Sequence, residues 1–407
     1  MIPRSFLAEN ARWLAAGAAL TFASSFGQTF FIALFGAELR AEFGLSHGGW
    51  GAVYTAGTVG SAALLTVAGA LSDRFRARAL AAAVLAAYAG VCLGMTQVSG
   101  PVGLALVVFG LRFCGQGMMS NIALTAMARW FSAQRGRAVA IVALGFSVGE
   151  AALPAATVAL MGVAPWRAAW VAAAAFLLAL IPAMFWLLAR ERTPRQLAEE
   201  SSVLGMDARH WTREQALGER AFWAVSLGVL APPFVNTALF FHQTTLAETK
   251  GWSLGQIAAA FPLYSALTIG ASFAAAAAVD RYGARRLLPL YQIPMACAAL
   301  ALSLGDAVWV VWLVFALVGL TQGAAVALLG AIWPELFGTR HIGAIRGVAV
   351  SAMVFATAAG PGITGGLIDL GVRLETQFLG MGALSLAVCA LFGLLSPRLG
   401  RRLPARA

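Results

Sequence analysis

The feature that most constrains this chain is a series of about a dozen apolar stretches, each long enough to cross a lipid bilayer and followed by a short loop, many of them rich in arginine. A bilayer-spanning helix needs about 20 mostly apolar residues, because the hydrocarbon core contains no water to bond exposed backbone amides. Hydrophobic residues make up 60% of the chain and charged residues 11%, whereas soluble domains average roughly 45–50% and about 25%. The sequence therefore predicts an all-α integral membrane protein and excludes a soluble globule.

We predict twelve transmembrane helices. Several of them are rich in Ala and Gly, which allows helices to pack closely in lipid. Their approximate ranges are 13–36, 49–71, 79–97, 102–125, 138–160, 167–189, 221–246, 253–278, 286–304, 307–331, 347–368 and 374–395.

The distribution of Lys and Arg predicts the orientation, because cytoplasmic loops collect these residues. With the N-terminus inside, 23 of the 28 basic residues fall in inner segments, four in outer loops and one, Arg112, within a span. The four outer residues are Arg40, Arg167, Lys250 and Arg373. We therefore expect a multi-pass protein of a bacterial inner (plasma) membrane with both termini in the cytoplasm.

The net charge of +11 has the same origin. A basic chain can indicate nucleic-acid binding, but here the positive charge is spread over alternate loops, so we expect no nucleic-acid partner. The cysteines fall within apolar spans without paired spacing, and buried free cysteines behave as small hydrophobic residues. We expect no disulfide, no metal site and no cofactor for Cys92, Cys114, Cys297 and Cys389.

The longest polar interval, Arg190–Arg220, separates spans six and seven and mixes charges of both signs. It has the character of a solvated linker, with or without a surface helix. The predicted parts of the chain are an N-terminal six-helix bundle (1–190), a cytoplasmic central linker (191–220), a C-terminal six-helix bundle (221–396) and a basic cytoplasmic tail (397–407).

The two predicted bundles share landmarks at nearly one offset. The loop after span two contains Asp73-Arg74, and the loop after span eight contains Asp280-Arg281, 207 residues later. Span four carries Gln116-Gly117, and span ten carries Gln322-Gly323, 206 residues later. A parallel repeat of six helices explains both offsets, and such repeats are typical of secondary transporters that move two halves about a central site.

The loop motifs resemble those of the major facilitator superfamily. The run Gly69-Ala-Leu-Ser-Asp-Arg-Phe-Arg-Ala-Arg78 is similar to the family signature G-x-L-x-D-R-x-G-R-[RK], although Arg76 and Ala77 replace the expected Gly and Arg. The segment 129–138 resembles the family's W-F-x-x-x-R-G-R-A loop, and 111–117 resembles its R-x-x-x-G pattern in helix four. The resemblance covers the whole chain and implies a twelve-helix secondary transporter that works by alternating access.

The resemblance also implies a gating role for the repeated Asp-Arg loops. In the family, the acid of this loop and its basic neighbours form a latch on the cytoplasmic face in the outward-open state. The alternative, that these arginines are only topology signals, does not explain the two aspartates. The corresponding residues are Asp73, Arg74 and Arg78 in the first copy and Asp280, Arg281 and Arg285 in the second.

Two ionisable residues lie deep within spans: Arg112 in span four and Glu150 in span five. A charged residue at this depth costs roughly 2.5–3.5 kcal/mol on insertion scales, so such residues usually pair or serve a substrate path. In one interpretation Arg112 anchors an anion or relays charge and Glu150 carries a proton. In the other, the two form a permanent structural ion pair.

In the family, helices one, four, seven and ten line the central cavity. Polar side chains midway along them are candidates for substrate contacts, and a hydrogen bond between helices is the alternative for each neutral one. Pro232-Pro233 predicts an interruption of span seven that acts as a hinge. His47 and His242, towards the outer face, are minor candidates for proton coupling. The selected cavity residues are Gln28, Arg112, Gln116, Asn236, Thr237 and Gln322.

The energy source and substrate follow from what the chain lacks. It contains no phosphate-binding G-x-x-x-x-G-K-[ST] loop, so we expect an ion gradient, with protons as the coupling ion. Four scattered histidines without an H-E-x-x-H motif argue against an enzyme. The region 145–154 lacks the G-P-x-x-G-G element of drug/proton antiporters. We therefore expect a monomer that takes up or exchanges a small organic metabolite, with carboxylates as candidates; proton-coupled efflux of drugs or lipophilic metabolites is the alternative.

The orientation is testable by labelling introduced cysteines from outside the cell. A membrane-impermeant maleimide should modify a cysteine at Ser46, in the predicted outer loop, and spare one at Ser202, in the predicted linker. The reverse labelling pattern would invert the topology.

Overall fold

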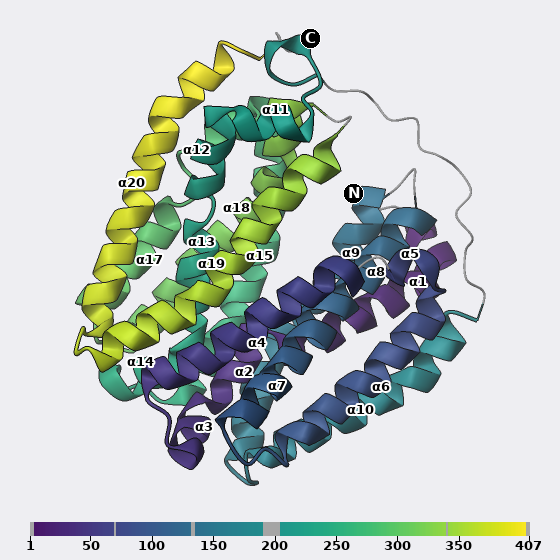
Figure 1. Ribbon diagram of the computed structural model, residues 1–407, viewed down its shortest axis with the longest axis vertical. Coiled ribbons are helices and arrows are strands. Elements are labelled where there is room, and N and C mark those ends of the chain that lie inside the picture. The colour runs from purple at the N-terminus through teal and green to yellow at the C-terminus, as the bar shows by residue number, and fades with distance from the viewer. Residues whose placement is uncertain (1–3, 69–70, 132–134, 190–203, 339–340, 404–407) are drawn as a thin grey trace. The chain divides into compact units, whose positions relative to one another are not determined.

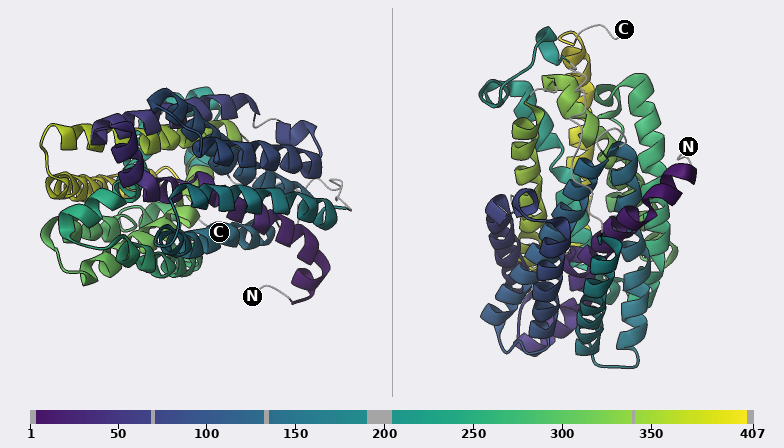
Figure 2. Two further views of the ribbon diagram at one scale, coloured as in Figure 1. Left: turned by 90° about the horizontal axis from the view of Figure 1, so that it is seen from below. Right: turned by 90° about the vertical axis from the view of Figure 1, so that its right-hand side faces the viewer.

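The computed structural model describes residues 4–68, 71–131, 135–189, 204–338 and 341–403 of the 407-residue chain. The chain forms two compact units: Met1–Glu199 with Phe240–Thr245, and Glu200–Leu239 with Leu246–Ala407. All regular secondary structure in the described ranges is helical (Figure 1 and Figure 2). The predicted all-α fold is confirmed.

The first unit packs its long helices in pairs, with α6 beside α10 and α1 beside α9. Its elements are α1 (Arg4–Ala23), η1 (Ser24–Gly27), α2 (Thr29–Ile32), η2 (Ala33–Phe35), α3 (Gly36–Phe43), α4 (His47–Ala68), α5 (Leu71–Arg74), α6 (Ala77–Met95), α7 (Pro101–Leu111), η3 (Arg112–Met119), α8 (Ser120–Trp130), α9 (Arg135–Met161) and α10 (Arg167–Leu187).

The second unit is dominated by the pairs α15 with α18 and α17 with α20. Its elements are η5 (Met206–Ala208), α11 (Arg213–Gly218), α12 (Arg220–Gly228), α13 (Ala231–Phe241, whose last two residues belong to the first unit), α14 (Gln243–Lys250, shared in the same way), α15 (Leu254–Tyr282), α16 (Ala284–Leu287), α17 (Ile293–Leu304), α18 (Trp309–Phe337), α19 (Ile342–Asp369) and α20 (Leu374–Gly400).

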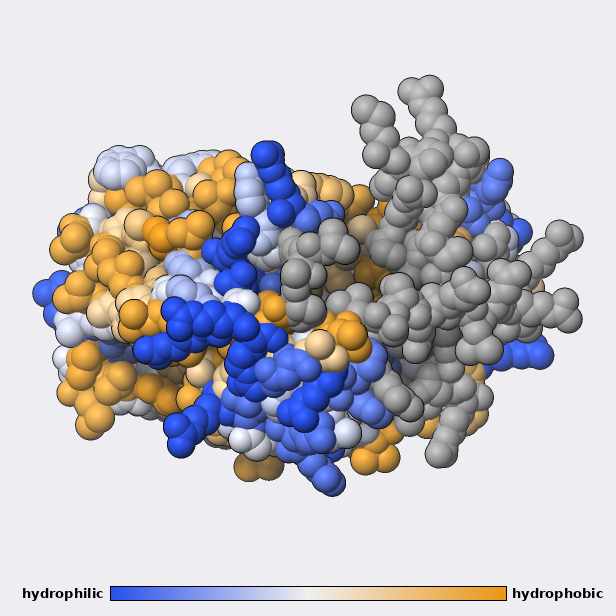
Figure 3. All heavy atoms as spheres, turned by 90° about the horizontal axis from the view of Figure 1, so that it is seen from above, coloured by the Kyte–Doolittle hydropathy of each residue, from blue (hydrophilic) through white to orange (hydrophobic). Residues whose placement is uncertain are grey.

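Ten helices in the described ranges are long and apolar enough to cross a membrane, and the number is eleven when the bent pair Leu7–Gly27 and Thr29–Phe43 is counted as one broken span. The remaining predicted span, 286–304, contains the shorter apolar helix α17. Figure 3 looks onto the end of the molecule that carries α11, where hydrophilic side chains gather and apolar side chains lie towards the flanks. This distribution agrees with a chain that spans a bilayer.

Spans one and seven are both broken, and a side chain bonds the carbonyl group at each break. In span one, Gln28 is extended (φ −84°, ψ 155°), and the two halves differ in direction by 44°. In span seven, α12 ends at Gly228 before α13 begins. The Gln292 side chain donates from Nε2 to the Gly228 carbonyl at 2.9 Å.

The prolines of span seven begin a helix and do not kink one. Pro232 and Pro233 lie in the first turn of α13, where the missing N–H has no intrahelical acceptor and its loss costs nothing. The predicted interruption exists, but it lies before the prolines, at residues 229–230.

On the predicted outer side, one cation joins the loops of each unit. In the first unit Arg167 pairs with Glu42 of α3 and donates to the Thr96 carbonyl at 3.2 Å. In the second unit Lys250 pairs with Asp306 at 2.5 Å and with Glu375 at 3.6 Å. Arg373 also pairs with Glu375, at 3.4 Å.

The described half of the predicted linker is not a solvated tether. Met206 and Trp211 are buried in the apolar core of the second unit with Phe222 and Phe337. The Trp211 backbone N–H donates to the Phe337 carbonyl at 3.0 Å. Apolar residues between the charges explain the difference, because they add surface that the second unit can bury.

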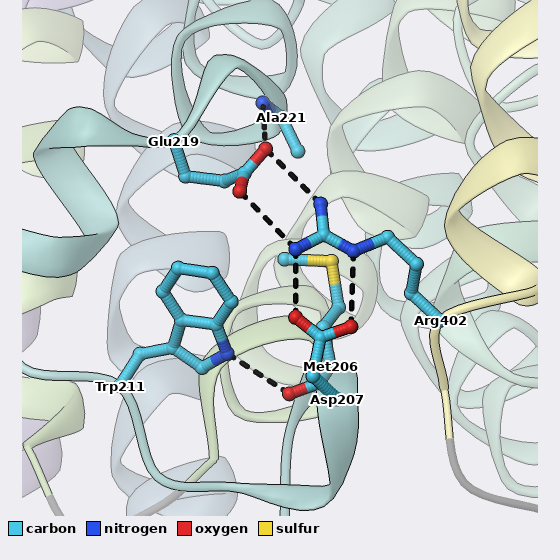
Figure 4. Close-up of polar contacts among 6 residues, drawn as sticks. All are labelled: Met206, Asp207, Trp211, Glu219, Ala221 and Arg402. Atoms are coloured by element: carbon cyan, nitrogen blue, oxygen red, sulfur yellow. Dashed lines mark hydrogen bonds and ion pairs between the residues drawn. The ribbon is translucent and has the colours of Figure 1, made fainter.

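Arg402, in the predicted tail, closes this segment. Its guanidinium bonds both carboxylate oxygens of Asp207, at 3.1 and 2.7 Å, and also pairs with Glu219 at 3.1 Å (Figure 4). The Asp207 backbone N–H donates to the Arg402 carbonyl at 2.7 Å. Hydrogen bonds from Arg402 hold the pKa of Asp207 and the pKa of Glu219 below their ordinary values.

We expect Arg402→Met to loosen this segment in a pH-dependent manner. A carboxyl group whose pKa is depressed on folding stabilises the fold above its unfolded pKa and loses that effect as the pH falls through the folded value. Because these groups are partly exposed, the loss at pH 7 should be about 0.5–1 kcal/mol. Hydrogen exchange at the Asp207 amide should therefore speed up at pH 7, and the difference from the parent should be smaller at pH 3, because protonation of the carboxyl groups removes their charge.

Arg401→Met is the matched control. Arg401 is exposed and directly follows α20, so its replacement should leave the exchange rate of the Asp207 amide unchanged. A difference for Arg402→Met that is the same at both pH values would contradict the ionic origin of the contact.

Candidate functional site

Arg112 lies in the interior of the first unit, 1% exposed, at the start of the π-helix η3. Its Nη1 donates to the Gly27 carbonyl at 3.1 Å and to Thr29 Oγ1 at 3.4 Å. The guanidinium carbon lies 5.4 Å from the centre of the Tyr54 ring, and Tyr54 OH is 2.6 Å from Thr29 Oγ1. The described partners of this buried cation are therefore all neutral groups.

The position of Arg112 follows from the break in span one. Gly27 ends η1, and the carbonyl groups at a helix end have no intrahelical donor and attract positive charge. Arg112 supplies both the donor and the charge. The π-helical turn that carries it is a feature found frequently at functional sites.

Tyr88 of α6 adds a second buried polar group beside this break. Its hydroxyl is fully buried and has no hydrogen-bond partner among the described residues. It lies so close to Gly115 of η3 that a Cβ there would be 2.2 Å from it. A buried hydroxyl normally has a hydrogen-bond partner. Tyr88 is therefore a candidate for contact with a substrate, and the sequence analysis missed it.

Glu150 does not pair with Arg112 in this structure. Glu150 is half-buried on α9 and forms no ion pair within the described part of the chain. The preceding Gly149 packs against span one so closely that a Cβ there would be 2.0 Å from Ser25 Oγ. The guanidinium is instead taken up by Gly27 and Thr29, so the predicted permanent ion pair is not present in this conformation.

Two of the three predicted cavity residues of the first unit, Gln28 and Gln116, are partly exposed. Gln28 lies at the break in span one, and Gln116 lies within η3. Neither side chain has a hydrogen bond among those described. Arg112 and Gln116 are four residues apart, a spacing that places two residues on one face of an α-helix. The i→i+5 bonding of the π-helix changes that register, and of the two only Arg112 is buried.

The predicted cavity residues of the second unit are neutral amides and a hydroxyl. Thr237 is buried on α13, and the neighbouring Asn236 has a buried Oδ1 without a hydrogen-bond donor in the described ranges. Gln322 is half-buried on α18.

The predicted gating residues differ in what they contact. The side chains of Asp73 and Arg74 lie outside the described residues. Arg78 stacks over the Phe185 ring at 5.6 Å. In the second copy Asp280 and Arg281 are exposed.

Arg285 binds within its own unit, because its Nη1 donates to the Ser396 carbonyl of α20 at 2.7 Å. Glu335, which sequence analysis missed, accepts at 2.8 Å from the backbone N–H of Ala284, the first residue of α16. The internal repeat contained a signal for it: at an offset of 206, Glu335 corresponds to Arg129, so the charge is inverted.

Comparison with known proteins identifies the family. The family model "Major Facilitator Superfamily" matches residues 17–274 and 236–407. The chain belongs to the major facilitator superfamily. It is therefore a membrane transporter and not an enzyme.

Solved structures of the superfamily share this fold. A bacterial homologue of the human lysosomal transporter Spinster, in an inward-facing and unoccupied conformation, matches with a TM-score of 0.75 and 15% identity over 98% of this chain and 99% of that one. A mutant of the nucleoside transporter NupG matches with a TM-score of 0.66 and 14% identity over 94% and 99%. At these identities the comparison shows the fold alone.

A curated relative is similar in sequence. It is a protein of Thermoproteus tenax named "Uncharacterized 38 kDa protein in 23S RNA operon", 27% identical over 321 residues, which are 78% of each chain.

The structure predicts that Arg112 and Glu150 contribute independently to stability. Arg112→Met leaves the Gly27 carbonyl without its donor, which should cost about 1–3 kcal/mol. Glu150→Gln should have a much smaller effect, and the double variant should show a coupling energy below about 0.5 kcal/mol. Unfolding of the parent, both single variants and the double variant in detergent measures the coupling. A coupling energy above about 1 kcal/mol would instead support an ion pair between Arg112 and Glu150.

Proposed function

We propose that this protein is a secondary active transporter that moves a small organic metabolite bearing a carboxylate by alternating access, driven by protons, as a monomer in a bacterial plasma membrane with both termini in the cytoplasm. The observation that carries the substrate class is Arg112. It is a fully buried guanidinium whose described partners are neutral and whose Nε has no partner. An anionic substrate supplies the missing charge in a medium where a lone charge is costly.

Glu150 is the proposed proton carrier. It is the acidic side chain deep in a span of the first unit, half-buried and without an ion pair in the described ranges. An acid in this setting can hold a proton in one conformation and release it in another, as intramembrane carboxyl groups do in proton relays.

In this proposal the second unit contacts a neutral part of the substrate. Asn236, Thr237 and Gln322 are uncharged, and the described spans of this unit carry charged residues only towards their ends. This observation also favours the second candidate, efflux of a drug or lipophilic metabolite. The gating role stays with Asp73, Arg74, Arg78, Asp280, Arg281 and Arg285, to which we add Glu335.

A thermal-shift screen of the purified protein against metabolites and drugs tests the substrate class. Small carboxylates should raise the unfolding temperature of the parent, and their neutral amide analogues should not. The shift should be lost in Arg112→Met. Stabilisation by cationic or neutral lipophilic compounds alone would favour efflux.

Proton coupling is tested with the compound that the screen identifies, in proteoliposomes. Glu150→Gln cannot release a proton, so it should abolish accumulation driven by a pH gradient while leaving exchange of labelled for unlabelled substrate. Glu9→Gln, the same change at an exposed position of α1, is the matched control and should accumulate substrate normally. Normal accumulation by Glu150→Gln would remove Glu150 from the coupling mechanism.

A further inference from the structure

Six residues of span seven belong to the first unit by their contacts, although the chain on either side of them belongs to the second unit. We call this stretch, Phe240–Thr245, the crossing segment. All of its residues are buried. The helix is interrupted within it, because α13 ends at Phe241 and α14 begins at Gln243, which leaves His242 at the break.

Backbone and ring contacts hold the crossing segment to spans one and two. Gln243 donates from Nε2 to the Phe30 carbonyl at 2.8 Å. The Phe241 ring stacks on Trp50 with a centroid distance of 5.3 Å and lies 4.8 Å from the Tyr54 ring. These contacts are insensitive to pH.

His47 contacts the crossing segment at Thr245 and also contacts Arg40, and protonation acts directly on the contact with Arg40. Arg40 Nη1 lies 3.1 Å from His47 Nε2, and Thr245 Oγ1 lies 3.3 Å from His47 Nδ1. A guanidinium can only donate, so Nε2 must be the acceptor and the proton of a neutral imidazole is on Nδ1. We assign this tautomer from its partners. In this form His47 accepts from Arg40 and donates to Thr245.

A proton added at Nε2 removes the acceptor that Arg40 uses and places two positive charges in contact. The repulsion displaces the His47 ring from Arg40, and with it the Nδ1–H that bonds Thr245. The His242 ring, with its centroid 6.4 Å from that of His47, would add a third charge if it also took up a proton. Glu42 is already bonded to Arg167, and Lys250 to Asp306. Two helices, α3 and α14, carry the charged groups around His47 and His242. These groups are Glu38, Arg40, Glu42, Glu248 and Lys250.

We propose that His47 and His242 form a proton-binding site on the predicted outer face, and that proton uptake there releases the crossing segment from the first unit. Histidine is the side chain whose ordinary titration falls between pH 5 and 8. In a transport cycle the site would respond to external acid, separately from Glu150. The inference goes beyond the proposed function, since release is a property of the folded protein and requires no substrate.

The test measures the exposure of position 244. Thr244 is buried, and its Oγ1 would be 3.2 Å from a Cβ at Gly36. In a protein whose four native cysteines are replaced by alanine, Thr244→Cys is labelled with a maleimide at pH 7.5 and pH 5.5. Each rate is divided by that of Ser46→Cys, an exposed site, to remove the pH dependence of the thiol. The ratio should rise about tenfold at pH 5.5, as expected for the loss of a hydrogen bond to a charged group.

Histidine variants assign the effect. His47→Gln keeps a neutral donor and acceptor, so the ratio should no longer change with pH, and His242→Gln should reduce the change. His341→Gln, at an exposed position outside the segment, is the matched control and should behave as the parent. A ratio independent of pH in the parent, or a change that persists when both His47 and His242 are replaced, would overturn the proposal.

Hydrogen exchange of Phe240–Thr245 reads the same release in the protein without introduced cysteines, with amides of α15 as the reference for intrinsic pH dependence. It decides the question if Thr244→Cys or His47→Gln fails to fold. If labelling of Thr244→Cys changes with pH but the protein shows no proton-driven accumulation, the histidine site is supported and the proposed proton coupling is contradicted. If labelling does not change with pH but accumulation is proton-driven, the histidine site is contradicted and the proposed function is unaffected.

Discussion

The carbonyl group of Gly27 needs a hydrogen-bond donor, and Arg112 provides it. In hydrocarbon an unsatisfied backbone group costs several kcal/mol, so a broken span persists only where protein groups bond its ends. The break in span one and the buried guanidinium therefore depend on one another. A substrate anion that drew Arg112 away would leave this carbonyl unbonded, so binding at Arg112 would change the conformation of span one. In this conformation Arg112 therefore stabilises the break in span one.

Span seven meets the same requirement with a neutral group. Gln292 bonds the Gly228 carbonyl, where Arg112 bonds that of Gly27. An amide satisfies the backbone without bringing a charge into the membrane, so the second unit needs no buried counter-ion. Of the two units, it is the first that carries charged side chains deep within its described spans, Arg112 and Glu150. Two similar helix breaks are thus bonded by side chains of different charge.

Sequence reasoning predicted Arg112 and Glu150 as buried ionisable residues because charge within an apolar run is visible locally. It did not predict that Arg112 would bond span one, since its competing partners lie 85 residues away and across a helix break. Sequence reasoning described the second half of the linker as solvated, because its many charged residues outweigh the apolar Met206 and Trp211, which the structure buries. Glu335 was missed for a related reason: its partner, the Ala284 amide, is a backbone group that composition does not reveal.

The sequence by itself determined the membrane class, the approximate spans, the predicted orientation and the repeat, because hydrophobic length and loop charge are properties of short segments. Only the tertiary structure decided which partner each polar group takes. It gave Arg112 to a backbone carbonyl and not to Glu150, and it placed Phe240–Thr245 in the first unit although its neighbours in the chain belong to the second. Both outcomes depend on groups far apart in the sequence that compete for the same contacts, and that competition is settled only when the helices pack.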